Sequence, residues 1–259
     1  MPAIPLQALI FDVDGTLADT ERDGHRIAFN DAFREAGLDW RWDVPLYGEL
    51  LAVTGGKERI RHYLQGAHPS LLMEPGIDAR IAALHQAKTR HYVELVSRGG
   101  LPLRPGVARL IQEARANGLR LAIATTTTPE NVSVLLKHSL APDAVDWFEV
   151  IGAGDIVPAK KPAPDIYRWV LDQLGLPPEA CLAFEDSDNG LRASRGAGLA
   201  TIVTVNDYTV DHDFTGATVV LSDLGEPTQP FRCLSGDAGS AVCADLRALR
   251  HWHSTARGR

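Results

Sequence analysis

The sequence LQALIFDVDGTL (Leu6–Leu17) joins an apolar run to two closely spaced aspartates. Its first half, Leu6–Phe11, is nearly continuous in apolar residues, which predicts a strand buried on both faces of a parallel sheet. Asp12 and Asp14 follow at once, and ligands of open α/β sheets bind at the carboxyl ends of the strands. Two carboxylates one residue apart repel each other unless a cation joins them. An Asp-Gly turn or a helix cap at Asp14 is the structural alternative, but the pattern favours a functional site.

Further short apolar runs repeat the pattern of this first strand along the chain. They cover residues 119–124, 150–151, 181–184, 201–205 and 218–221. Helical patterns lie between them, and these have apolar residues at i, i+3, i+4 and i+7. The alternation predicts an α/β fold, a Rossmann-like parallel sheet with helices on both sides.

Residues 20–100 interrupt this alternation with several helical patterns and no convincing strand. We therefore expect two domains: a core formed by residues 1–19 and 101–259, and an inserted all-helical cap formed by residues 20–100. The expected hinges are Ala18–Glu21 and Arg98–Gly100, because glycine and proline cluster around the second of them.

Composition bounds the class of protein. The chain has 259 residues, 45% of them apolar, and its 26 basic and 33 acidic residues give a net charge of −7, which disfavours nucleic acid as a partner. No apolar run approaches the ~20 residues of a membrane span, and we recognise no targeting segment. Three cysteines without metal-type spacing fit a reducing compartment. We expect a cytoplasmic monomer that binds a small molecule and not a membrane. The sequence does not indicate a role for residues 225–259.

A second acidic pair, Glu185 and Asp186, ends the predicted strand Cys181–Phe184. With Asp12 and Asp14 at a neighbouring strand end, the pair predicts a cluster of four carboxylates. Hard oxygen ligands without histidine or cysteine nearby select Mg²⁺ over zinc.

A threonine run and a lysine supply candidate phosphate ligands. Thr125 follows the predicted strand at residues 119–124 and opens the run Thr125–Thr128, before Pro129. Hydroxyls and free N–H groups at a helix start can cradle a phosphate, although helix capping alone explains them equally well. Lys161 precedes a helix near the strand ends, where a phosphoryl group would need a cation.

In their order and spacing, Asp12-x-Asp14, Thr125, Lys161 and Glu185-Asp186 resemble the four motifs of the haloacid dehalogenase superfamily. The resemblance extends nearly to Leu224, and the helical insertion is similar to the C1 cap of the β-phosphoglucomutase and phosphatase branch. Within that branch, residues 19–26, 54–59 and 125–128 are similar to the CbbY-type sugar-bisphosphate phosphatases. That family is associated with carbon fixation and removes xylulose-1,5-bisphosphate, an inhibitor of Rubisco.

The resemblance implies a role for each motif, in agreement with the chemistry of the residues. Asp12 is the nucleophile that forms an aspartyl-phosphate, and Asp14 protonates the leaving oxygen and then activates water. Thr125 and Lys161 hold phosphoryl oxygens. Mg²⁺ is the implied cofactor, and its expected ligands are Asp12, the Asp14 carbonyl, Glu185 and Asp186.

The cap is expected to recognise the rest of the substrate. Gly55 and Gly56 precede a helix whose N–H groups and dipole converge with Lys57 and Arg59 on one anion site. Lys88 lies on an apolar helical stripe, and the alternative for it is to extend into solvent. The remaining expected substrate-binding residues are Asp19, His25, Thr126 and Thr127, with Tyr47 and Arg104 as weaker candidates. A core histidine is the alternative for His25.

The sequence therefore predicts a Mg²⁺-dependent phosphatase of a phosphorylated sugar, with xylulose-1,5-bisphosphate as the expected substrate. A β-phosphoglucomutase-like mutase shares every core residue, and a phosphoglycolate phosphatase is a further alternative. A dehalogenase is disfavoured, because Asp14 and the acidic cluster would then lack a purpose. A non-catalytic binding module is disfavoured because every catalytic position is filled.

Overall fold

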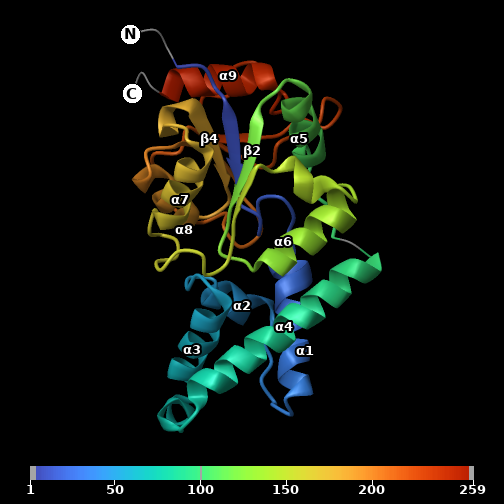
Figure 1. Cartoon of the computed structure of the whole chain (residues 1–259), viewed down its shortest axis with the longest axis vertical. Helices are drawn as coiled ribbons and strands as arrows, with labels where there is room; N and C mark the ends of the chain where they lie inside the picture. Colours follow the sequence, from blue (N-terminus) through green and yellow to red (C-terminus); the bar gives the residue numbers. More distant parts are fainter. Residues whose placement is uncertain (1–3, 100, 257–259) are drawn as a thin grey trace.

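A computed structural model describes residues 4–99 and 101–256 of the chain, which form a seven-stranded sheet flanked by helices (Figure 1). The strand order is β3-β2-β1-β4-β5-β6-β7. Strands β1 to β6 run parallel, and β7 pairs antiparallel with β6 at the edge. The strands are β1 (Ala8–Phe11), β2 (Arg120–Ala124), β3 (Val150–Gly152), β4 (Cys181–Glu185), β5 (Ala200–Thr204), β6 (Val219–Leu221) and β7 (Cys233–Gly236). The predicted α/β, Rossmann-like fold is confirmed, with β7 as a strand that the apolar pattern did not predict.

Helices cover both faces of the sheet, because side chains alternate along each strand. Leu9 and Phe11 pack on the face covered by α5 and α9, whereas Ala8 and Ile10 pack on the face covered by α7. The Phe11 ring stacks on Phe184 of β4 at a centroid distance of 4.5 Å, so the ends of β1 and β4 lie side by side. The helices are α1 (Arg26–Glu35), α2 (Val44–Leu50), α3 (Gly56–Ala67), α4 (Ile77–Gly99), α5 (Val107–Ala116), α6 (Pro129–Leu135), α7 (Asp165–Leu174), α8 (Asp188–Gly196) and α9 (Leu246–Thr255).

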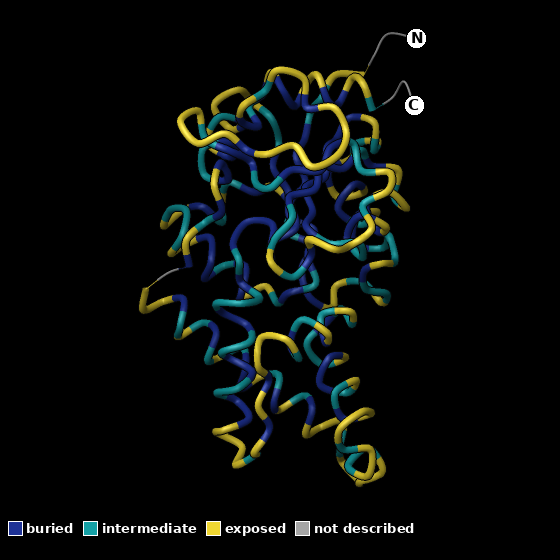
Figure 2. The backbone as a smooth tube through the Cα atoms, turned by 180° about the vertical axis from the view of Figure 1, so that it is seen from behind, coloured by how far each residue is buried: buried dark blue, intermediate teal, exposed yellow. Residues whose placement is uncertain are grey.

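Helices α1 to α4 follow β1 and form the lower half of the molecule in Figure 1, with α4 crossing α1. Within residues 20–99 the structure contains no strand. These helices bury a separate apolar core, which includes Phe29, Trp42, Ile60 and Leu84. Figure 2 shows the continuous buried segments along the sheet and shorter buried stretches on the cap helices.

We keep the division into a core of residues 1–19 plus 101–259 and a cap of residues 20–100 as a proposal. Residues 1–3, 100 and 257–259 of that division, including Gly100 of the expected hinge, lie outside the described residues. The two linkers between the halves run together, because Ala18 forms an antiparallel bridge with Leu103.

The C-terminal segment, which has no assigned place from sequence alone, completes the core through β7 and α9. Asp245 caps α9 by accepting a 2.8 Å hydrogen bond from the Ala248 N–H, and Trp252 is fully buried. Arg109 of α5 anchors this segment, since its guanidinium donates to the carbonyls of Gly225 (2.7 Å) and Ala244 (3.1 Å).

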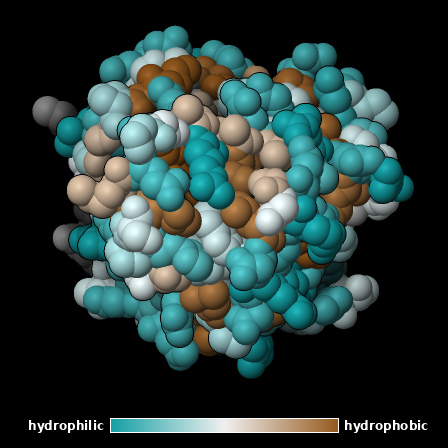
Figure 3. All heavy atoms as spheres, turned by 90° about the horizontal axis from the view of Figure 1, so that it is seen from below, coloured by the Kyte–Doolittle hydropathy of each residue, from teal (hydrophilic) through white to brown (hydrophobic). Residues whose placement is uncertain are grey.

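The surface of the cap end is mainly hydrophilic, with apolar side chains in scattered patches (Figure 3). Among the helices of residues 4–99 and 101–256, none is both long and apolar enough to cross a membrane. The longest, α4, has 23 residues and carries charged side chains along its length.

Candidate active site

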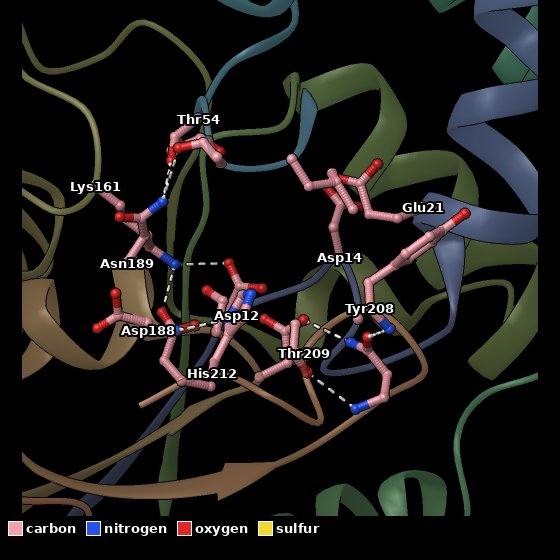
Figure 4. A pocket seen from close by; sticks show the side chains of 18 of the residues that line it. Asp12, Asp14, Glu21, Thr54, Lys161, Asp188, Asn189, Tyr208, Thr209 and His212 are labelled. Atoms are coloured by element: carbon pink, nitrogen blue, oxygen red, sulfur yellow. Dashed lines mark hydrogen bonds and ion pairs between the residues drawn. The ribbon is translucent and has the colours of Figure 1, made fainter. Parts of the chain in front are cut away.

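The site begins where β1 ends. The Asp12 N–H donates to the Phe184 carbonyl at 3.0 Å, which fixes the aspartate beside the end of β4, and its side chain is buried. The Lys161 ammonium lies 2.6 Å from Asp12 Oδ1 and 2.6 Å from Glu185 Oε1 (Figure 4). The structure thus unites three residues that are distant in sequence and were predicted to act together.

Three carboxylates form a compact acidic group that we call the acidic cluster: Asp12, Glu185 and Asp186. One oxygen of each lies within 4.8 Å of the others. Glu185 Oε1 also accepts from the Tyr167 hydroxyl, whereas its buried Oε2 has no hydrogen-bond partner among the described residues. Hard carboxylate oxygens with one unsatisfied acceptor fit a cation such as Mg²⁺.

The charges of the acidic cluster are poorly compensated by protein groups alone. Burial raises the pKa of Asp12 to about 7, although the Lys161 charge works against it. Burial likewise raises the pKa of Asp186 well above its usual range. The pKa of Lys161 is raised, because the charges of Asp12 and Glu185 outweigh the lowering effect of burial. A divalent cation would therefore favour the ionised state of these carboxyl groups.

The carboxylate of Asp14 lies apart from this cluster, although four clustered carboxylates were expected. Its Oδ1 accepts a 2.6 Å hydrogen bond from Thr20 Oγ1 and lies 2.8 Å from His25 Nε2. Burial alone would raise the pKa of Asp14, but the charge and hydrogen bond of His25 and the Thr20 hydroxyl lower it. Thr20 of the expected hinge and His25, four residues beyond that hinge, hold the Asp14 carboxylate away from the acidic cluster.

His25 connects Asp14 to the cap lysine. Lys88 Nζ lies 2.9 Å from His25 Nδ1, and the lysine is only 4% exposed. Lys88 therefore does not extend into solvent, which was its structural alternative. Burial lowers its pKa to about 8, while the charge of Asp14 raises it in part. Asp14, His25 and Lys88 form a continuous polar chain from the core into the cap.

The threonine run contains a helix cap, and part of it lines the cavity where phosphate ligands were expected. Thr128 caps α6 by accepting from the Asn131 N–H at 3.4 Å. Thr125 is fixed by its N–H, which donates to the Gly152 carbonyl at 2.9 Å. Thr125 and Thr126 line the cavity that also contains the acidic cluster, and Thr127 lines a smaller neighbouring cavity.

The cavity between core and cap has a volume of about 260 Å³. Arg59 of α3 lines it, 6% exposed, and donates to the Tyr47 hydroxyl at 2.8 Å beside the Glu21 carboxylate at 3.5 Å. Tyr47 itself is fully buried and lines neither this cavity nor the smaller one, so the expectation that it contacts substrate is not supported, whereas Asp19 lines the cavity. The volume lies below the ~300–1,000 Å³ typical of drug-sized ligands, which favours a small substrate.

Lys57 and the two glycines that precede it lie in different places relative to the cavities. Gly55 and Gly56 line the smaller cavity with His25 and Lys88, next to the start of α3. The side chain of Lys57 is instead 39% exposed and lies 2.6 Å from Asp155 Oδ2 at the outer rim. Among the cap cations that the sequence indicated, Arg59 and Lys88 therefore face the two cavities, and Lys57 lies outside both.

Sequence reasoning missed several residues at this site. Asn206 follows β5 and donates from Nδ2 to Asp186 Oδ2 at 2.7 Å; its position just after a predicted strand could have indicated it. Glu21 and Tyr208 line the cavity, and Thr20 binds Asp14. Tyr167 lies on the apolar face of α7, and its pattern indicates only core packing.

The nucleophile-type aspartate, the lysine and the acidic cluster at the ends of parallel strands define a class of phosphate-processing hydrolase. The chain matches the haloacid dehalogenase-like hydrolases over residues 6–198, and it belongs to that family.

Comparison with individual relatives identifies the branch of this family that the chain resembles. The plasmid-encoded CbbY protein of Cupriavidus necator is 53% identical over 249 residues, covering 96% of this chain and 97% of that protein. The crystal structure of CbbY from Rhodobacter sphaeroides in complex with phosphate shares 47% identity with a TM-score of 0.76, over 84% of this chain and 94% of that chain. A mutant of the Rhodobacter protein was solved in complex with xylulose-1,5-bisphosphate. Within its family, the chain is a CbbY-type phosphatase.

Proposed function

We propose that this protein is a Mg²⁺-dependent sugar-bisphosphate phosphatase whose substrate is xylulose-1,5-bisphosphate, hydrolysed through an aspartyl-phosphate on Asp12. One observation carries the proposal: a single cavity has the acidic cluster with Lys161 at its core end and Arg59 on its cap wall. A bisphosphate needs such separated anion sites. The complex of the Rhodobacter relative with this sugar supports the choice of substrate. Removal of a Rubisco-inhibitory sugar in the cytoplasm is part of the same proposal.

Asp12 and Asp14 would have different roles in the reaction, the first as nucleophile and the second as general acid and base. Asp12 Oδ attacks phosphorus in line, and the bond between phosphorus and the sugar oxygen breaks. Asp14, held by Thr20 and His25, gives its proton to that leaving oxygen. Water then attacks the aspartyl-phosphate, and Asp14 accepts its proton as inorganic phosphate leaves. Because His25 and Thr20 favour the ionised form of Asp14, they suit its role in the second step.

The site also suits a cation. Asp12, Asp186 and the Asp14 carbonyl would hold Mg²⁺, with the free oxygen of Glu185 next to them. When bound, Mg²⁺ neutralises carboxylate charge and polarises the phosphoryl group. Lys161 neutralises charge on the same side, and Thr125 offers a hydroxyl to a phosphoryl oxygen.

The second phosphate would be bound from the cap. Arg59 and Lys88, the α3 N-terminus with Gly55 and Gly56, and Thr126 surround the two adjoining cavities. Lys57 becomes a weaker candidate than the sequence indicated, because Asp155 already neutralises it at the rim.

The test is a comparison of kcat/KM for xylulose-1,5-bisphosphate, sugar monophosphates and phosphoglycolate, with and without Mg²⁺. The proposal requires Mg²⁺-dependent release of phosphate and a preference for the bisphosphate. An isomerised sugar phosphate without net phosphate release would favour a mutase. A preference for phosphoglycolate would refute the sugar assignment.

A further inference from the structure

Arg104 is a buried arginine on the segment that returns from the cap to the core, and it is 8% exposed. Its Nη1 donates to the carbonyls of Gly15 and Thr204, the latter at 3.0 Å. Its Nη2 donates to the carbonyls of Val205 and Ser222, the latter at 2.9 Å. Both terminal nitrogens are thus engaged by the backbone, so Arg104 is not a substrate ligand of the kind its sequence position indicated.

Two of these carbonyls, those of Gly15 and Val205, belong to backbone segments that lie beside the Asp186 carboxylate. Gly15 has a φ of +84°, and a Cβ there would lie 2.2 Å from Asp186 Oδ2 and 2.6 Å from Asn206 Nδ2. Only glycine permits so close an approach in that conformation. Asn206 directly follows Val205, and it donates to Asp186 Oδ2 at 2.7 Å. Arg104 therefore fixes both segments that enclose the Asp186 carboxylate.

Arg104 also joins the two linkers between core and cap, next to the segments that enclose the Asp186 carboxylate. Its backbone N–H donates to the Leu17 carbonyl at 2.8 Å, and its Nε lies 3.5 Å from Asp19 Oδ1. The residue thus connects the turn after β1, the end of β5 and the return linker at one point. A planar guanidinium offers five N–H donors in a wide, fixed fork, whereas the ammonium of lysine offers three donors from a single nitrogen.

We propose that Arg104 is a positioning residue for the cation site: through Gly15 and Asn206 it holds the Asp186 carboxylate where it can bind Mg²⁺. This inference rests on the Mg²⁺ site of the proposed function. It assigns to Arg104 an effect on cation affinity, whereas a structural role alone would affect only the stability of the fold.

The test is the dissociation constant of Mg²⁺ for the substrate-free protein, measured by titration calorimetry. Arg104→Lys keeps the charge and loses the fork of donors, and we expect Mg²⁺ binding to weaken about tenfold, as when partners of metal ligands are removed. Arg109→Lys is the matched control, because Arg109 also donates to several backbone carbonyls but anchors the C-terminal segment. It should lower the Tm and leave Mg²⁺ binding unchanged.

Asn206→Ala removes the last link to Asp186 without touching Arg104. It should weaken Mg²⁺ binding to a similar extent. The variant that carries both Arg104→Lys and Asn206→Ala should lose less Mg²⁺ affinity than the sum of the two separate losses. Wild-type affinity in Arg104→Lys, or an equal loss in Arg109→Lys, would overturn the inference. A wild-type protein that binds no Mg²⁺ would overturn the proposed cation site, and this inference with it.

Discussion

Replacing Arg59 by alanine should reduce turnover of the sugar bisphosphate selectively. Arg59 lines the main cavity from the cap helix α3, and it is almost fully buried, so solvent screens its charge little. Burial opposes its charged form, but the neighbours Tyr47 and Glu21 raise its pKa, so the guanidinium stays charged. A charge-assisted hydrogen bond contributes roughly 1.5–3 kcal/mol, which corresponds to a loss of about tenfold to over a hundredfold in kcat/KM.

The matched variant is Lys57→Ala, two positions away on the same helix. Lys57 is exposed and paired with Asp155, and such surface pairs contribute about 0–1 kcal/mol. We expect its kcat/KM for the bisphosphate to change less than about fivefold.

The assay is steady-state phosphate release from xylulose-1,5-bisphosphate and from an aryl phosphate, which offers nothing for Arg59 to bind. Arg59→Ala should slow phosphate release from the bisphosphate and leave release from the aryl phosphate nearly unchanged. An equal loss on both substrates would show that Arg59 supports the fold or closure of the cap. A larger loss in Lys57→Ala than in Arg59→Ala would refute the assignment of the cap cations.

Three further predictions concern the acidic cluster. Asp12→Asn should abolish phosphate release and raise the Tm of the metal-free protein, since one buried charge is lost; substantial residual turnover would exclude Asp12 as the nucleophile. Because the pKa of Asp12 is raised from 3.8 to about 7, the folded protein holds an extra proton in this range, so the free energy of unfolding without metal should fall as the pH rises through it. If thermal unfolding measured at a series of pH values shows no decrease in the free energy of unfolding, the raised pKa of the buried Asp12 carboxyl group is wrong. Mg²⁺ at a hundred times its dissociation constant should raise the free energy of unfolding by about 2.7 kcal/mol, and denaturant titrations that show no gain would argue against the cation site.

The sheet was predictable from its apolar runs, and the core motifs were predictable because three of these runs end at polar residues. Asp12, Thr125 and Glu185 each follow or end a run, and parallel pairing brings those ends together. The edge strand β7 was not predictable in this way, because its residues are exposed and lack the apolar run that marks the other strands.

The cap residues show the limit of sequence patterns. Lys57 and Arg59 both follow the Gly-Gly start of α3, and the sequence alone does not say which of them faces the core. On a helix these positions point about 200° apart, so the structure turns one toward the cavity and the other to the rim. The turn of Asp14 toward His25 depended on the linker path, which no local pattern records.

The most direct test of the account follows the phosphoryl group itself. The enzyme is mixed with sugar bisphosphate carrying a radioactive label on the phosphate to be removed, quenched in acid during the first turnover, and digested to locate the label. We expect a labelled peptide that contains Asp12, forms only with Mg²⁺ and is absent from Asp12→Asn. Phosphate released with no protein-bound label, or label on another residue, would contradict it.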